Sequence, residues 1–385
     1  MQKKLIVVAV AGALGAPALA MAQASTVQIY GKSVIEYGYV NQGTGKPNAD
    51  IMQAPGGVSV GFKGTEALGG GLSAWFQCES SADPRGDTAA GFCTRNSAIG
   101  MKGGFGNVYI GKWDTPMKRV FLRGEVGAED TGLLGISDYL AGGSTGAAAG
   151  GAVARTLWQR RQHDSINYDT PNFSGFQGHF QYSASNATAT TNASTSAKPR
   201  IWSVAALYDN GPLSLGLGYE KHSQFGAATS STDDHAYVLS GAYTFAGKVK
   251  VGGSYNKQDY DTGAGTSLQK KGWTLGVDWN LSGPHNLWAN YTSTGDVSGT
   301  GAIAGVPAAT GVFPAAGANT GAKKWGVGYQ HKFSKRTDGK LGYVRLDNDS
   351  AASYNLMGTN NTGTTAATRA GHSQDAWVML IRHSF

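Results

Sequence analysis

The chain has 385 residues with 58 glycines, 41% hydrophobic residues, 15% charged residues and a formal net charge of +7. The glycines follow no three-residue period, which excludes a collagen-like protein, and no run of Lys and Arg is dense enough to favour a nucleic-acid-binding protein. The mean hydropathy of −0.25 does not exclude a membrane protein, because the strands of a transmembrane barrel alternate polar and apolar residues.

The N-terminal segment has the three parts of a secretory signal peptide. Lys3 and Lys4 form a basic start, Leu5–Leu19 is apolar, and small residues follow around Ala22 and Ala24. We predict a signal peptide over residues 1–22, with cleavage after Ala22 or Ala24, and a mature β-barrel over residues 23–385. The apolar stretch is shorter than the ~20 residues of a membrane-spanning helix, which argues against an uncleaved anchor. Without its two lysines, the mature chain has 30 basic and 25 acidic residues, a net charge of +5.

The mature sequence repeats units of roughly ten residues in which apolar and polar residues alternate. In one unit, Trp273, Leu275 and Val277 alternate with Thr274 and Gly276. A period of two is typical of a β-strand with different surroundings on its two faces. We predict sixteen strands, over residues 27–40, 51–64, 71–80, 94–103, 107–113, 155–169, 176–185, 200–209, 213–222, 235–246, 248–258, 269–281, 285–294, 322–333, 339–349 and 372–385.

The connections between the predicted strands alternate in length. Short turns lie at 65–70, 104–106, 171–175, 210–212, 246–247, 282–284 and 334–338, and long loops at 41–50, 81–93, 114–154, 186–199, 223–234, 259–268, 295–321 and 350–371. This alternation is typical of outer-membrane proteins, which have short periplasmic turns and long extracellular loops. An open sheet edge cannot face lipid, so the first and last strands must pair. We therefore predict an all-β fold, a 16-stranded antiparallel transmembrane β-barrel, with an aqueous interior.

Two cysteines, Cys78 and Cys93, flank the second long loop. In an exported protein such a pair predicts a disulfide. Closing a loop of this length contributes about 3 kcal/mol in the chain-entropy model. A two-cysteine metal site is the alternative, but no other Cys and no His lies near the pair in sequence.

Several stretches along the mature chain resemble the trimeric general porins of Gram-negative bacteria, in particular the betaproteobacterial type. The matching stretches are Val27–Lys32, Val60–Glu66, Leu68–Leu72, Gly106–Lys112, Asn167–Phe176 and Ile381–Phe385. The resemblance implies a homotrimer in which each subunit has its own pore and the third long loop folds into the barrel. It also implies that Phe385, at the end of the last strand, is the signal for the outer-membrane assembly machinery.

The third loop, at 114–154, is long enough to predict a functional role. The resemblance implies that it narrows the pore and that basic wall residues face its carboxylates. Strand alternation points the wall candidates inward, because a lipid-facing charge at mid-membrane costs about 2–4 kcal/mol. The predicted basic wall is Lys32, Lys63, Lys102 and Arg161, and the predicted loop residues are Asp114, Arg119, Arg123, Glu125, Glu129 and Asp130. Rim charges or scaffold ion pairs are the alternative role for any one of them. The loop lacks the Pro-Glu-Phe-Gly type of motif found in the family.

We expect an outer-membrane porin that forms a channel for passive diffusion of ions and small hydrophilic solutes. The basic residues on its wall predict a mild anion preference. The expected partners are a homotrimer, the lipid bilayer and lipopolysaccharide of the outer membrane, and the outer-membrane assembly machinery. We expect no nucleic acid, metal or cofactor.

Three other functions are alternatives. One is a substrate-selective channel, and one is an adhesin, although the loops at 299–321 and 360–368 are rich in Gly, Ala and Thr rather than patterned for a partner. The third is a barrel enzyme, for which no G-x-S-x-G or H-E-x-x-H motif is present. His163 and Asp164 are adjacent, so we expect them to face opposite sides of their strand.

Overall fold

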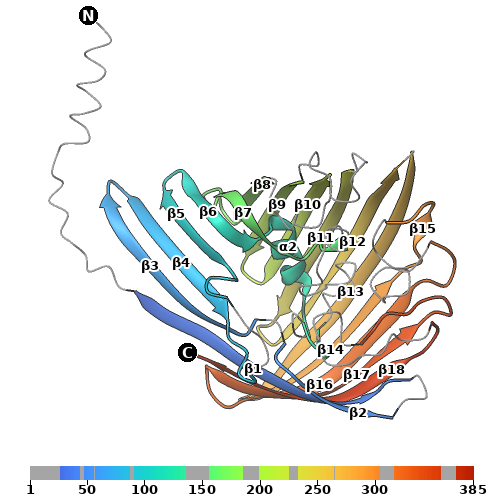
Figure 1. Cartoon of the computed structure of the whole chain (residues 1–385). Helices are drawn as coiled ribbons and strands as arrows, with labels where there is room; N and C mark the ends of the chain where they lie inside the picture. Colours follow the sequence, from blue (N-terminus) through green and yellow to red (C-terminus); the bar gives the residue numbers. More distant parts are fainter. Residues whose placement is uncertain are drawn as a thin grey trace, which may run out of the picture.

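The computed structural model describes residues 27–43, 47–55, 57–86, 91–127, 129, 131–135, 156–184, 199–224, 233–263, 265–303, 316–356 and 370–385. The predicted signal peptide lies outside these residues. Within them the chain is mainly β-strand (Figure 1). The elements are β1 (Gln28–Asn41), β2 (Ala49–Gln53), β3 (Ser59–Gly69), β4 (Leu72–Ser81), β5 (Ser97–Gly103), β6 (Gly106–Asp114), α2 (Pro116–Gly124), β7 (Arg161–Asp169), β8 (Phe176–Ala184), β9 (Arg200–Asn210), β10 (Leu213–Ser223), β11 (Asp233–Phe245), β12 (Val249–Gly263), β13 (Thr266–Ser282), β14 (His285–Thr294), β15 (Ser298–Gly299), β16 (Ala322–Lys332), β17 (Thr337–Asn348) and β18 (Gln374–Ser384).

The strands form one antiparallel sheet that closes on itself. β18 returns to pair with β1 along ten residues, from Lys32↔Ser384 to Asn41↔Asp375. β2 and β3 pair with different halves of β1, so together they fill one position in the wall, and β15 is a two-residue strand beside β13. The described part of the chain is therefore a closed barrel with sixteen positions in its wall, and the predicted fold class is confirmed.

The outer face of the barrel is apolar and carries rings of aromatic residues. Toward the extracellular ends, neighbouring strands place aromatic side chains in contact, with ring centroids 5.0 to 5.5 Å apart, in the pairs Tyr219–Tyr237, Trp273–Tyr291, Trp325–Tyr343 and Tyr343–Trp377. Toward the periplasmic ends, Phe176 contacts Tyr208 and Tyr243 contacts Phe245. Two such girdles around an apolar band are typical of a barrel that spans a lipid bilayer. Among the described residues, no helix is long and apolar enough to cross a membrane.

The C-terminal residue closes the seam between the first and last strands. The Phe385 N–H donates to the Gly31 carbonyl at 3.0 Å, and the Gly31 N–H donates to the Phe385 carbonyl at 3.1 Å. A Cβ on Gly31 would overlap the Phe385 ring, so only glycine leaves room for that ring. The seam is therefore paired to its last residue, as a barrel in lipid requires.

Cys78 on β4 and Cys93 in the following loop form the predicted disulfide. It joins the wall to the second long loop. A hydrogen bond beside the disulfide also joins this loop to β4, because the Cys93 N–H donates to the Ser80 hydroxyl at 2.9 Å.

Several predicted boundaries are wrong. The single strand predicted at 51–64 is two strands, β2 and β3. The turn predicted at 65–70 is mostly strand, because β3 continues to Gly69 and pairs with β4 as far as Gly69↔Leu72. The strand predicted at 155–169 begins at Arg161 instead, because Trp158 turns inward and stacks on His222 with ring centroids 4.0 Å apart. The long loop predicted at 259–268 is largely strand, since β12 and β13 continue pairing as far as Gly263↔Thr266. Tyr260 and Leu268 are buried there, which explains why these residues extend the wall.

The expectation that His163 and Asp164 face opposite sides is also wrong. Asp164 has a φ of +52°, and the register of β6 with β7 shifts between Gly111 and Trp113. Such a bulge re-aims side chains, and here the His163 Nδ1 lies 2.8 Å from an Asp164 carboxylate oxygen. Among the described residues, no hydroxyl or thiol contacts this imidazole.

Candidate pore constriction

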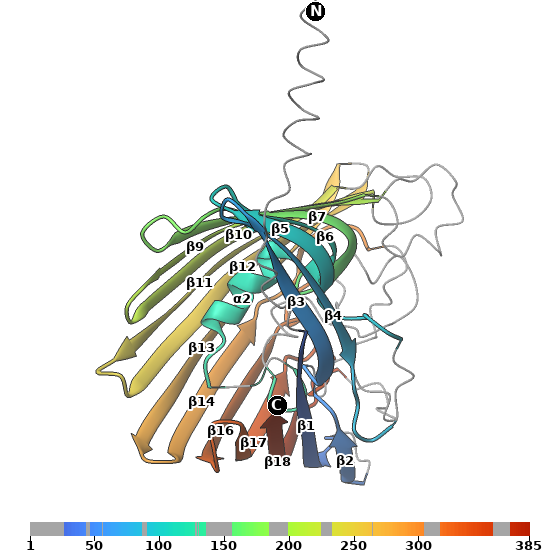
Figure 2. The same ribbon diagram turned by 90° about the vertical axis from the view of Figure 1, so that its left-hand side faces the viewer.

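The connection after β6 turns into the lumen and begins with α2, which Figure 2 shows inside the ring of strands. Thr115 caps the helix, because its hydroxyl accepts a hydrogen bond from the Lys118 N–H at 3.3 Å. Pro116 occupies the first turn, where a helix needs no N–H donor. The sequence therefore starts a helix at the point where the chain leaves the wall.

One face of α2 is anchored to the lumen side of β9–β12. Met117, Val120 and Phe121 are fully buried, and burying each such side chain contributes about 1.5–3 kcal/mol. The Met117 N–H donates to the Ser203 hydroxyl at 3.1 Å, and the Ser240 hydroxyl donates to the Val120 carbonyl at 2.5 Å. The apolar wall residues in this cluster are Ala205, Leu207, Ala236 and Val238.

After α2 the loop backbone lies directly on the wall at β13 and β14. A Cβ on Gly276 would overlap the carbonyl oxygen of Val126, so this close approach requires glycine. Polar wall residues bind the next peptide group: Asn290 donates to the Gly127 carbonyl at 2.5 Å, and the Gly127 N–H donates to Asp278 at 3.3 Å. The loop is thus fixed to the wall through its main chain.

Glu129 binds a cluster of cations at the last two strands. Its carboxylate lies 2.8 Å from the Lys340 ammonium and 3.2 Å from the Arg382 guanidinium, and Arg382 also pairs with Asp338 at 2.8 Å. Burial acts to raise the pKa of the Glu129 carboxyl, but the charges of Lys340 and Arg382 outweigh it and hold the pKa below its usual range. Lys32 on β1 lowers this pKa as well.

The loop then reaches β1 and β16. The Leu133 N–H donates to the buried Glu36 carboxylate at 2.6 Å, and the Lys324 ammonium donates to the Gly135 carbonyl. Leu133 and Leu134 are fully buried in an apolar cluster on this part of the wall. The segment 116–135, where described, therefore follows the wall from β8 to β1.

The lumen side of β3–β6 lies outside this path except at β6, where Arg119 reaches Tyr109 and Lys118 reaches Asp114, and we call this side the open wall. Two predicted basic residues, Lys63 on β3 and Lys102 on β5, are exposed there. The Lys63 ammonium lies 4.9 Å from the centroid of the Tyr30 ring. Neither lysine forms an ion pair with a described residue, so both leave their positive charge in the lumen.

Arg161 and Asp114 form an ion pair where the third loop leaves and rejoins the wall. Their side chains are 3.1 Å apart, and Asp114 also lies 3.1 Å from the Lys118 ammonium. Asn96 supports both partners, accepting from Arg161 at 3.1 Å and donating to Asp114 at 2.7 Å. Here the scaffold role that the sequence left open is the one that the geometry favours.

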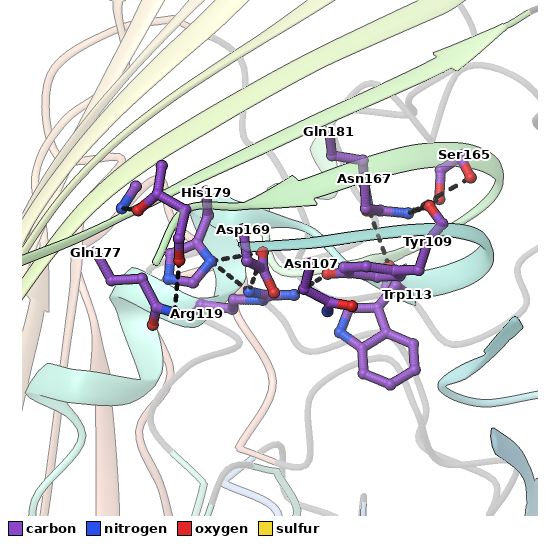
Figure 3. Close-up of polar contacts among 12 residues, drawn as sticks. Asn107, Tyr109, Trp113, Arg119, Ser165, Asn167, Asp169, Gln177, His179 and Gln181 are labelled. Carbon is purple, nitrogen blue, oxygen red and sulfur yellow. Dashed lines mark hydrogen bonds and ion pairs between the residues drawn. The ribbon is translucent and has the colours of Figure 1, made fainter. Parts of the chain in front are cut away.

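Arg119 binds a polar group on β6–β8, shown in Figure 3. Its guanidinium lies 3.0 Å from the Asp169 carboxylate and 2.6 Å from the His179 Nδ1, and it also donates to the Tyr109 hydroxyl. These contacts hold the helix against β6–β8, on the side opposite to its apolar anchor.

The remaining predicted loop residues are placed separately. Arg123 pairs with Asp209 at the periplasmic end of β9. Glu125 caps the C-terminus of α2 and is partly buried. Asp130 lies outside the described residues. The structure thus brings Glu129 and Lys32 together, while Lys63 and Lys102 lie on the open wall.

Sequence reasoning did not select Lys340 and Glu36 as part of the site. Strand alternation places Lys340 on the same face as Val344, and Glu36 on the same face as Lys32. That signal identifies them as inward-facing. It does not identify them as loop contacts, because the path of the loop depends on residues from several distant strands.

A closed β-barrel with an apolar outer face, aromatic girdles and a loop-lined lumen has the architecture of an outer-membrane channel. Comparisons with known proteins agree. The model of the Gram-negative porin family matches residues 7–352, and the chain belongs to this family.

Individual relatives match along much of the sequence. The chain is 30% identical to outer membrane porin protein 32 of Delftia acidovorans over 395 aligned residues, which cover 100% of both chains. It is 30% identical to major outer membrane protein P.IB of Neisseria meningitidis serogroup B over 232 residues, covering 58% of this chain and 61% of that one. Among solved structures, the anion-selective porin from Comamonas acidovorans superposes with a TM-score of 0.73 at 24% identity, covering 94% of this chain and 100% of that one. The chain is an outer-membrane porin.

Proposed function

We propose that this porin is a passive channel that favours small anions. The observation that carries this proposal is the difference between its charged groups. The described carboxylates Asp114 and Glu129 are each paired with two cations, whereas Lys63 and Lys102 face the lumen without an acidic partner. Unpaired charge of one sign in a narrow channel raises the local concentration of the opposite ion.

The test is the reversal potential of the protein in a planar bilayer under a potassium chloride gradient. We expect an anion-signed potential that moves toward zero in the double variant Lys63→Gln and Lys102→Gln. The matched control is Lys323→Gln, which removes the same charge from the outer face of β16. A cation-signed potential in the unmodified protein would contradict the anion preference. A protein that never conducts would contradict the channel, and would leave the adhesin as the better reading.

We also propose that the protein is a homotrimer with one pore in each subunit. The resemblance to trimeric porins supports this, and the bilayer lipid, lipopolysaccharide and assembly machinery are the other partners that it implies. Conductance should then appear in three equal steps for each inserted particle. Single-step insertions, together with a monomeric mass in mild detergent, would refute the trimer.

We propose no catalytic role for the barrel. The acid–base pair that the fold does create, His163 with Asp164, has both side chains partly exposed, at 36% and 51%. Hydrolytic catalysis of the triad type needs a nucleophile in contact with the base. Among the described residues, none contacts His163.

A further inference from the structure

Three aromatic rings form a patch on the open wall. Trp75 lies on β4, and Tyr109 and Trp113 lie on β6. Their ring centroids are 5.2 to 5.7 Å apart, and Trp113 meets both other rings edge to face at 69°. Tyr109 is 2% exposed beneath the patch, whereas both indoles are partly exposed to the lumen.

The contacts around the patch hold its rings in place. The Trp75 indole N–H donates to the Asn107 side-chain oxygen at 2.7 Å. A Cβ on Gly100 would lie 2.8 Å from the Trp75 indole, so the ring rests on a residue without a side chain. The Tyr109 hydroxyl accepts from Arg119, and Figure 3 shows Trp113 beside the Tyr109 ring. Rings fixed in this way lose little entropy when a solute stacks on them.

The free charge beside the patch is positive. Lys102 lies directly opposite Asn107 in the β5–β6 register, which places their Cβ atoms about 5 Å apart. Lys102 is exposed and forms no hydrogen bond or ion pair with a described residue. The acidic groups nearby are already paired, Glu79 with Arg95 at 2.6 Å and Asp114 with Arg161 at 3.1 Å.

Partly exposed indoles beside an unpaired ammonium favour a ligand that has both an aromatic ring and a negative charge. Aromatic rings stack edge to face or offset on other aromatic rings, with a gain beyond that of buried area, and a lysine attracts a carboxylate. We propose that the Trp75–Trp113 patch with Lys102 is a binding subsite for small anions that carry an aromatic ring, such as aromatic carboxylates. The ring would stack on the indoles while the carboxylate reaches Lys102. This inference rests on the proposed channel function.

The test measures block of the chloride current through single trimers in a planar bilayer. Conductance in potassium chloride is recorded first, so that failure of the channel itself is seen separately. Sodium benzoate is then titrated, with sodium acetate as the carboxylate without a ring, benzyl alcohol as the ring without a charge, and glucose as a neutral sugar. We expect benzoate to reduce the current at concentrations at which the other three do not.

Substitutions then assign the block to the patch. Trp113→Leu and Trp75→Leu should each weaken benzoate block about threefold to tenfold, and Lys102→Gln should weaken it while leaving the effect of benzyl alcohol unchanged. The control is Trp377→Leu on the lipid face, where the side chain is 65% exposed. Equal block by acetate and benzoate would overturn the proposal, as would stronger block by glucose, or benzoate block that neither lumen tryptophan affects. Because the two tryptophans lie on different strands, a folding defect in one variant leaves the other as the test.

Discussion

Replacing Glu129 with Gln tests whether the ion cluster holds the third loop against the wall. The carboxylate is 9% exposed, and its partners Lys340 and Arg382 are 7% and 23% exposed. Removing one member of a buried ion pair costs about 3–5 kcal/mol, which is roughly two to four decades in the docking equilibrium. The burial of Leu133 and Leu134, about 1.5–3 kcal/mol each, still favours docking. We therefore expect a loop that stays docked most of the time but detaches far more often.

The assay is the open-channel current noise of single inserted channels at neutral pH. Glu129→Gln should raise this noise, because each detachment changes the cross-section of the pore. The control is Asp347→Asn, which makes the same chemical change on the outer face of β17. Noise in Glu129→Gln that equals the noise in this control would refute the role of the ion cluster.

The same cluster predicts the pH dependence of docking. The pKa of Glu129 is held below its usual value of about 4.5 in the folded protein. The docking free energy contributed by the Glu129 carboxylate is therefore fully present at pH values above 4.5. It is lost as the pH falls through the lowered pKa that Glu129 has in the folded protein. Current noise in the unmodified protein should therefore be the same at neutral pH and near pH 5, and should rise only in more acidic solution. A rise that begins between pH 7 and 5 would point to another group.

Three further variants test other contacts. Gly276→Ala places a Cβ in the space of the Val126 carbonyl and should displace the loop, which raised current noise would show and unchanged noise would contradict. Joint replacement of Cys78 and Cys93 by Ser should lower the free energy of unfolding by about 3 kcal/mol, measurable by urea titration in detergent, and equal stability would mean that the loop is already fixed. Gly31→Val overlaps the C-terminal ring and should lower the yield of the heat-modifiable folded form on unheated gels, whereas a normal yield would mean that the seam can adapt.

The wall of the barrel could be predicted from the sequence because alternation is a local property. On β13, Trp273 and Leu275 are outward and exposed while Thr274 is buried, as their spacing indicates. Alternation gave the wrong start for β7 near Trp158. An aromatic residue just before a strand fits the alternating pattern whether it belongs to the strand or packs into the lumen. Alternation failed again at Asp164, where one left-handed residue shifts the register.

The lining of the pore could be predicted only in part. Alternation identified Lys32, Lys63 and Lys102 as inward-facing residues, but it could not show which of them lie beneath the third loop. That depends on contacts such as Glu129 with Lys340, which are more than two hundred residues apart. Long-range pairs of this kind leave no periodic signal in a single sequence.

Because the third loop covers only part of the inner wall, the two sides of the barrel differ in how well they tolerate new inward-facing side chains. Where the loop lies on the wall, a new inward side chain would collide with it, as at Gly216 with Val120, at Gly276 with Val126 and at Gly38 with Leu133. Such overpacking typically costs about 1–3 kcal/mol. On the open wall, Lys63 and Lys102 are exposed, and a change at either position meets no residue of the third loop that the structure describes. Evolution can therefore retune what the channel passes on one side of the ring, while the other side keeps the fold intact.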